Sequence, residues 1–231
     1  MAAFGRAAGY VKRIAHPLTW ALGGGTLEFV WPRTSPPLRT TFLRENMEKT
    51  ERDRLRQMLL DRSMRFGEFV LSSGATSNYY IDVRKTSFHP EGLRMISKMF
   101  YEILLPDKIT AVGGLTLGAD PLVSGLMLYS SEQGHPLEGF VVRRNTKDHG
   151  MRGQVEGNLA GHRRVAILDD VITSGESALI AAEAAESYKA QVVRVVAVVD
   201  REQGASQIFQ QRGFPFRALF SIGELLPAER G

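Results

Sequence analysis

The stretch that decides the fold reads Val165-Ala166-Ile167-Leu168-Asp169-Asp170-Val171-Ile172-Thr173-Ser174-Gly175-Glu176-Ser177. Its four leading apolar residues predict a buried strand, and two carboxylates stand at the predicted C-terminal end of that strand. A loop rich in Thr, Ser and Gly then leads into a predicted helix. In open α/β sheets, ligands bind beyond the carboxyl ends of the strands, so we expect Asp169 and Asp170 to face a binding crevice.

The loop after the two aspartates has the chemistry of a phosphate site. Backbone N–H groups at the start of a helix are unpaired and carry partial positive charge. Gly175 permits close approach of the backbone, and Thr173, Ser174 and Ser177 add hydroxyl donors. The aspartates repel a phosphate but suit a vicinal diol, so the stretch indicates a ribose 5-phosphate site. Seen alone, an Asp-Asp pair is equally typical of a turn or a helix cap.

The complete pattern resembles the signature with which type I phosphoribosyltransferases bind phosphoribosyl pyrophosphate (PRPP). This resemblance implies that Asp169 and Asp170 lie on the ribose diol side and assist catalysis. It also implies that the following residues contact PRPP: Val171, Ile172, Thr173, Ser174, Gly175, Glu176 and Ser177. The sequence has no Walker A pattern and no Gly-x-Gly-x-x-Gly after a strand, which argues against other nucleotide-binding families.

A second polar stretch, residues 143–153, follows the predicted strand 139–142 and predicts a mobile loop. A mobile cationic loop suits a reaction that excludes water and stabilises a departing anion, although such a stretch alone is more typical of a solvated loop. The sequence is similar to the catalytic loop of orotate phosphoribosyltransferases. That resemblance implies contacts to PRPP or pyrophosphate from Arg143, Arg144, Lys147 and His149, with Lys147 as the catalytic residue. It also implies a homodimer in which the loop reaches the neighbouring active site.

Other segments resemble the same family less closely. Residues 66–74 and 77–82 are similar to its orotate-side hood, where Tyr79 and Tyr80 either stack on a pyrimidine or pack within a strand. Arg201 stands where the family grips the orotate carboxylate, together with the Thr173 region, although Asp-Arg at a strand end is by itself more typical of a surface ion pair.

Two positions depart from the common family pattern. Ser72 and Leu117 stand where many members have Lys, which puts any phosphate or orotate contact from those positions in doubt. Leu117 lies in a stretch, residues 113–121, that is similar to the family's pyrophosphate-side loop. Nearby positive charge is expected from Arg84 and Lys85.

Strand and helix patterns alternate along the chain, which predicts an α/β fold: a Rossmann-like parallel sheet flanked by helices, with a small N-terminal hood. We place the hood at residues 47–85 and the core at 86–231. Strands are expected at residues 66–71, 79–83, 109–112, 139–142, 164–168, 192–199 and 218–222. Helices are expected at residues 48–63, 89–105, 119–130, 176–188 and 206–211.

Residues 1–46 differ from the rest of the chain. Of the 29 basic and 25 acidic residues, six and two lie in this segment, which leaves 23 of each in the remainder. The basic excess therefore belongs to the segment, which we interpret as a poorly ordered extension, with Met47 as a possible natural start. Its apolar part is interrupted by Pro and Gly, so we expect no membrane span. Because the rest of the chain has no net charge, we also expect no nucleic-acid partner. The absence of cysteine excludes disulfides and thiolate chemistry.

The resemblance as a whole implies an orotate phosphoribosyltransferase, a pentosyltransferase with PRPP and orotate as substrates. Mg²⁺ is the expected cofactor, held mainly by substrate oxygens and without a dedicated protein metal site. Missing targeting signals and the family imply a cytoplasmic protein. The alternatives are a phosphoribosyltransferase for another base, which should carry a different loop, and a PRPP-sensing regulator, which should lack Lys147. A fused decarboxylase domain would need a longer chain.

Overall fold

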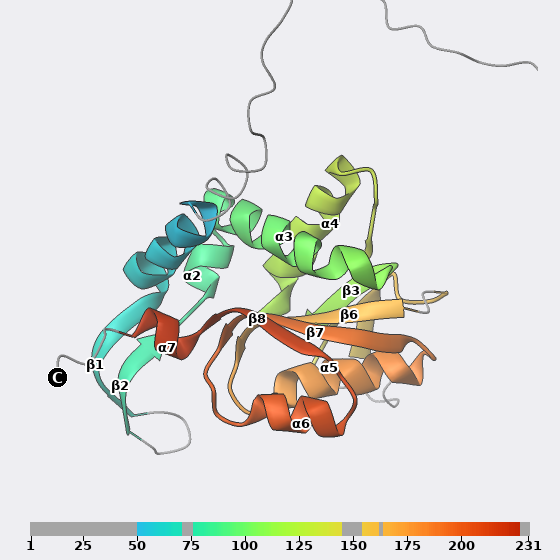
Figure 1. The fold of residues 1–231 in the computed structure, drawn as a ribbon. Helices are drawn as coiled ribbons and strands as arrows, with labels where there is room; N and C mark the ends of the chain where they lie inside the picture. The colour runs from blue at the N-terminus through green and yellow to red at the C-terminus, as the bar shows by residue number, and fades with distance from the viewer. Residues whose placement is uncertain (1–49, 71–75, 145–153, 162–163, 227–231) are drawn as a thin grey trace, which may run out of the picture. The chain divides into compact units, whose positions relative to one another are not determined.

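The protein contains a six-stranded sheet and a separate two-stranded sheet (Figure 1). The computed structural model describes residues 50–70, 76–144, 154–161 and 164–226, all within one compact unit of residues 41–231. The large sheet has the order β5-β4-β3-β6-β7-β8, with β5 antiparallel to β4 and the other pairs parallel. Its strands are β3 (Ala111–Leu115), β4 (Glu138–Val142), β5 (Val155–Gly157), β6 (Arg164–Ile172), β7 (Gln191–Asp200) and β8 (Phe216–Ser221).

The central strand β6 is buried on both faces because its side chains alternate between two cores. Val165 and Ile167 pack into one core, and Ala166 and Leu168 into the other. Helices α3 (Pro90–Leu104) and α4 (Ala119–Glu132) cover one face of the sheet. Helices α5 (Glu176–Ser187) and α6 (Ala205–Gln211) cover the other. The expected parallel sheet with helices on both faces is therefore confirmed.

Several predicted boundaries were wrong by a few residues. The strand expected at residues 109–112 is β3, which begins at Ala111. The strand expected at residues 164–168 continues to Ile172, so Asp169 and Asp170 lie inside β6 and not after it. The extension has a physical reason, because Leu168 to Ile172 remain paired with β7, where Val171 stands opposite Val199. The two aspartates interrupt the run of apolar residues in the sequence, but the backbone pairing of β6 with β7 continues past them.

The two-stranded sheet consists of β1 (Met64–Val70) and β2 (Thr76–Ile81), paired antiparallel with Phe66 opposite Tyr79. A helix over residues 50–58 and a wider turn, η1 (Leu59–Ser63), precede it. Leu55 of this helix and Leu59 and Ser63 of η1 are buried, and Met58 is half-buried, so one face of the predicted helix 48–63 packs against the core. Short helices α2 (Arg84–Ser87) and α7 (Ile222–Leu225) and a 3-10 turn, η2 (Leu105–Asp107), were not predicted, because each is too short for a periodic pattern. The hood boundary at residue 85 stays a prediction.

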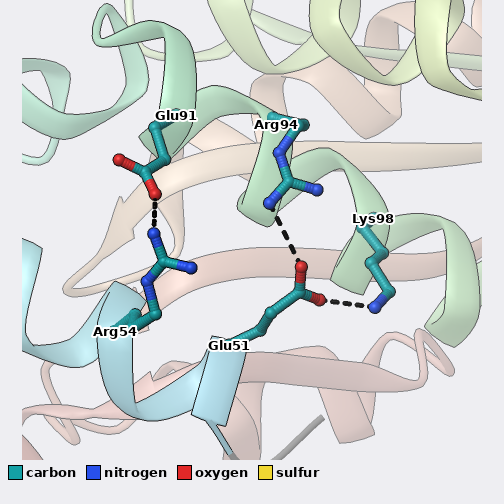
Figure 2. Close-up of polar contacts among 5 residues, drawn as sticks. All are labelled: Glu51, Arg54, Glu91, Arg94 and Lys98. Atoms are coloured by element: carbon teal, nitrogen blue, oxygen red, sulfur yellow. Dashed lines mark hydrogen bonds and ion pairs between the residues drawn. The ribbon is translucent and has the colours of Figure 1, made fainter. Parts of the chain in front are cut away.

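An ionic clamp joins the helix over residues 50–58 to α3 (Figure 2). Glu51 lies between two cations of α3: it accepts from Arg94 Nη2 at 3.1 Å and pairs with Lys98 Nζ. Arg54 of the same helix pairs with Glu91 at the start of α3. We call these five residues the helix clamp. None of the helices among the described residues has the length and apolar character that a membrane crossing needs.

Candidate active site

The candidate site lies at the carboxyl edge of the large sheet, where β6 runs through its two aspartates into the loop before α5. Asp169 is 5% exposed, and its Oδ1 accepts from the backbone N–H of Asp170 at 2.9 Å. Asp170 Oδ1 accepts from the N–H of Val171, also at 2.9 Å. Each carboxyl is thus held by the peptide that follows it, which orients both side chains.

Burial gives this acid pair unusual electrostatics. Burial, and then the negative charge of Asp170, raise the pKa of Asp169 well above its usual value. Burial also raises the pKa of Asp170, although the hydrogen bond from Val171 works against it. Adjacent carboxyls that are both desolvated do not ionise together easily. The pair therefore retains a proton more readily than two surface aspartates.

The loop at residues 173–175 ends on a glycine that no other residue can replace without strain. Gly175 has φ +84°, a left-handed conformation, and a Cβ there would lie 2.8 Å from Phe209 Cζ. As the N-cap of α5, Gly175 contributes no side-chain cap, and the N–H of Glu176 lies 3.5 Å from Ser174 Oγ. The first turn of α5 therefore presents N–H donors and the positive end of the helix dipole to a ligand. Thr173 and Ser177 beside it are half-buried, and Val171 and Ile172 complete the strand.

The β3–α4 connection closes the site around Asp170. A Cβ at Gly118 would lie 2.5 Å from Asp170 Oδ1, so this glycine leaves the space that the carboxyl occupies. Gly113 and Gly114, grouped by sequence with the same loop, lie instead within β3, where side chains would overlap Phe140 and Ala119. Their role is close packing of the sheet, which the glycine pattern alone did not distinguish from an anion site. Leu117 is 65% exposed.

The predicted cations lie in three different environments. Arg144 donates from Nη2 to Ser177 Oγ at 3.2 Å and lies 3.6 Å from Glu176 Oε1, which places it at the start of α5. Arg143 forms an ion pair with Glu156 of β5 at 2.9 Å. Arg84, which pairs with Asp82, is close enough to Asp170 for that carboxylate to raise its pKa further. Lys147, His149 and Ser72 lie outside the described residues.

Arg201 follows β7 and meets the two-stranded sheet. Its backbone N–H donates to Ile172 O at 2.9 Å, so its main chain is fixed beside the end of β6. Its guanidinium donates from Nε and Nη2 to the hydroxyl of Tyr79, both at 3.2 Å. Asp200 instead accepts from the N–H of Glu202 at 2.8 Å, so the surface ion pair considered from sequence is not formed in this structure. Tyr80 is exposed, and its ring lies near Phe69.

Comparison with known proteins agrees with this geometry. An orotate phosphoribosyltransferase of Aquifex aeolicus is 42% identical over 179 residues, which are 76% of this chain and 98% of the relative. The structure of the Mycobacterium tuberculosis enzyme in complex with Fe(III) dicitrate superposes with a TM-score of 0.68 at 35% identity, covering 76% of this chain and 98% of that one. The chain belongs to the orotate phosphoribosyltransferase family. A search of family models found no match.

Membership of the orotate phosphoribosyltransferase family confirms the resemblance inferred from residues 66–82, 143–153 and 165–177. The fold is confirmed as well, including against the M. tuberculosis enzyme in complex with PRPP, which superposes with a TM-score of 0.64 at 31% identity and covers 76% of this chain and 98% of that one. The family is one of glycosyltransferases, so the expected enzyme class is also confirmed.

Two site features of this family member escaped the sequence reasoning. One is the contact of Arg201 with Tyr79, which joins residues 122 positions apart. The other is the closeness of Gly118 to Asp170, which depends on how β3 and β6 align. Neither leaves a local signal, because each arises from pairing between distant segments. Among the residues that the structure describes, no group of three or more His, Asp or Glu side chains is arranged to hold a metal ion.

Proposed function

We propose that this chain transfers the ribose 5-phosphate group of PRPP to orotate, giving orotidine 5'-monophosphate and pyrophosphate in pyrimidine nucleotide synthesis. One observation carries the proposal: the buried pair Asp169 and Asp170 is joined by a short loop to the open N-terminus of α5, at the carboxyl edge of a parallel sheet. Hydroxyl-binding carboxyls beside a phosphate-binding helix end match the two ends of a ribose 5-phosphate.

PRPP binding follows from the charges on this edge. The 5-phosphate lies on the loop from Thr173 to Ser177, where backbone N–H groups and hydroxyls donate to it. The ribose diol lies against Asp169 and Asp170, whose carboxyl oxygens accept hydrogen bonds from its hydroxyls. Arg144, which donates to Ser177 Oγ in this structure, adds positive charge beside the PRPP site.

The transfer step breaks the bond between the ribose C1 and the pyrophosphate oxygen, whose electron pair leaves with pyrophosphate. Arg143, Arg144, Lys147 and His149 stabilise the departing anion, with Lys147 as the main catalytic group. Carbon C1 gains positive charge as the bond breaks, which the nearby carboxylate of the acid pair stabilises. Orotate N1 then bonds to C1 and loses its proton.

Orotate is oriented through its carboxylate. The guanidinium of Arg201 is a planar fork that suits a carboxylate, and its main chain is bonded to Ile172, the residue before Thr173. The pyrimidine therefore lies between Arg201 and the Thr173 region, beside the ribose site.

Mg²⁺ is part of the proposal. As in the sequence-based expectation, the ion would be held mainly by pyrophosphate oxygens and ribose hydroxyls, without a dedicated protein metal site. The ion supplies positive charge to the pyrophosphate. We further propose a cytoplasmic homodimer in which the loop over residues 143–153 completes the neighbour's site.

The test follows the loss of orotate absorbance in the presence of PRPP and Mg²⁺, with uracil, adenine and hypoxanthine run in parallel. We expect consumption of orotate alone, and its dependence on added Mg²⁺ tests the cofactor. Turnover of another base in place of orotate would contradict the proposal.

A second test addresses the catalytic loop. Lys147→Ala is expected to lower kcat about 100-fold or more, because one charge that stabilises the departing anion is lost. Lys108→Ala removes an exposed lysine just after η2 and serves as the matched control, with kcat unchanged. Full turnover with normal PRPP affinity in Lys147→Ala would contradict the assignment.

A further inference from the structure

The contact between Arg201 and Tyr79 joins the large sheet to the two-stranded sheet at the candidate site. Tyr79 Oη accepts from both Nε and Nη2 of Arg201 at 3.2 Å, and the guanidinium carbon lies 5.1 Å from the centre of the Tyr79 ring. We propose that Tyr79 is a positioning residue, which orients the guanidinium of Arg201 toward the orotate carboxylate. This inference rests on the proposed function, in which Arg201 binds that carboxylate.

The donor arrangement of the guanidinium explains how one hydroxyl can set its direction. Arginine has five N–H donors in a rigid plane, and they form two edges that each suit a carboxylate. Tyr79 Oη occupies the edge formed by Nε and Nη2. Within the described part of the chain, no group accepts from the edge formed by Nη1 and Nη2. The contact therefore leaves one defined edge for a bidentate carboxylate.

Both partners of the contact are held independently of any ligand. The main chain of Arg201 is bonded to Ile172 O at 2.9 Å. Tyr79 is 8% exposed, packs in the core shared by α3 and α4, and pairs with Phe66 across the hairpin. Ser77 Oγ donates to Tyr79 O at 2.8 Å. A long arginine side chain loses rotamer freedom when it orders, and a fixed partner removes that loss before orotate binds.

A buried tyrosine with a purely structural role would give a different result, and the chain contains one for comparison. Tyr101 is 9% exposed, and its hydroxyl is 3.0 Å from His135 Nδ1, away from the carboxyl edge of the sheet. Tyr79→Phe and Tyr101→Phe each remove one hydroxyl and keep a buried ring. Similar losses of thermal stability are expected from both.

The decisive experiment compares steady-state constants of the full chain carrying Tyr79→Phe, Tyr101→Phe, Arg201→Lys or Tyr79→Phe together with Arg201→Lys. Tyr79→Phe is expected to raise the KM for orotate about tenfold, the lower end of the effect of a hydrogen bond to a charged group. The KM for PRPP should stay within about twofold, because the hydrogen bonds of Tyr79 go to Ser77 and Arg201 and not to the loop at residues 173–175. Tyr101→Phe should change neither KM. Adding Tyr79→Phe to Arg201→Lys should raise the KM for orotate almost no further, because the guanidinium that Tyr79 orients is already absent.

The outcomes separate the inference from the proposed function. A raised orotate KM in Arg201→Lys with an unchanged or lowered one in Tyr79→Phe overturns the inference alone. So does an equal rise of both KM values in Tyr79→Phe, or full additivity in the double variant. An unchanged orotate KM in Arg201→Lys overturns the role of Arg201 and the inference with it. No orotate turnover by the unaltered chain overturns both the proposed function and the inference.

Discussion

Two regions of this molecule hold carboxyl groups close to other charges, and the carboxyl pKa is shifted in opposite directions in the two. In the helix clamp, Glu51 is 19% exposed as a side chain, and its pKa is lowered: burial raises it, but the hydrogen bonds and charges of Lys98 and Arg94 together outweigh burial. In the acid pair, Asp169 is more deeply buried beside a second carboxyl, and its pKa is raised. The clamp carboxylate is ionised more easily in the folded chain than in the unfolded one, and the acid pair less easily.

The contrast is the one expected if the helix clamp serves stability and the acid pair serves the proposed reaction. A lowered carboxyl pKa contributes free energy to folding, whereas a raised one opposes folding wherever the group must ionise. Groups held in an unfavourable state are typical of functional sites, where a ligand later supplies the missing partner. Replacing a carboxylate by an amide should therefore change the free energy of unfolding in opposite directions in the two regions.

The largest expected effect is on turnover in the double variant Asp169→Asn and Asp170→Asn. We expect kcat/KM for PRPP to fall about 1,000-fold, because the groups that stabilise the ribose cation and bind the diol lose their charge. The free energy of unfolding should not fall, since an amide can accept the same backbone hydrogen bonds without a buried charge. Kinetics and urea unfolding measure the two quantities. A clear loss of stability would show that the pair is structural.

The loop beside the acid pair depends on backbone conformation in a way that the helix clamp does not. Gly175→Ala is expected to lower the free energy of unfolding by about 3 kcal/mol, from about 1 kcal/mol for the left-handed φ and the rest from overlap with Phe209. It should also weaken PRPP binding. Gly134 has φ +78°, and a Cβ there would meet no atom within 4 Å. Gly134→Ala should therefore lower the free energy of unfolding by only about 1 kcal/mol. Equal losses in urea unfolding would contradict the role of the overlap.

The pH dependence of stability should separate the two regions by sign. The folded pKa of Asp169 lies above 3.8, so its unfavourable contribution is present above that folded pKa and disappears as the pH falls through it. The folded pKa of Glu51 lies below 4.5, so its favourable contribution is present above 4.5 and is lost as the pH falls through the folded value. Relative to the unaltered chain, Asp169→Asn should gain most at neutral pH, and Glu51→Gln should lose most there. Unfolding at a series of pH values checks both, and a gain for Asp169→Asn that grows as the pH falls would contradict the assignment.

The smallest expected effect comes from the helix clamp itself. Glu51→Gln should lower the free energy of unfolding by about 0.5 to 1 kcal/mol, since the ion pairs are partly exposed. Turnover should not change, because the clamp residues form their ion pairs with one another, between the helix over residues 50–58 and α3. Salt should reduce the difference from the unaltered chain, because ions screen such pairs. A loss of kcat would show that the clamp influences the site.

Much of the fold and part of the site were predictable because the relevant signals are contiguous. The helix expected at residues 89–105 is α3, which begins at Pro90, since proline suits the first turn of a helix. Residues 165–177 also form the expected succession of strand, loop and helix. The length of β6 was not predictable, because pairing with β7 carries the strand through two aspartates. The close packing of Gly113 and Gly114 within β3 was not predictable for a similar reason, since only the spatial neighbours of a glycine show that no side chain fits there.

The sequence by itself determined the order of the longer helices and of the strands other than β5, the succession of acid pair, glycine-bearing loop and helix, and the family, because these depend on residue types at short spacing. Only the tertiary structure decided that Tyr79 holds Arg201, that Gly118 makes room for Asp170, and that Asp169 and Glu51 have pKa values shifted in opposite directions. Local backbone preferences act between neighbours in the chain. Burial, charge and hydrogen-bond geometry act between neighbours in space, which the packing of the sheets and helices brings together.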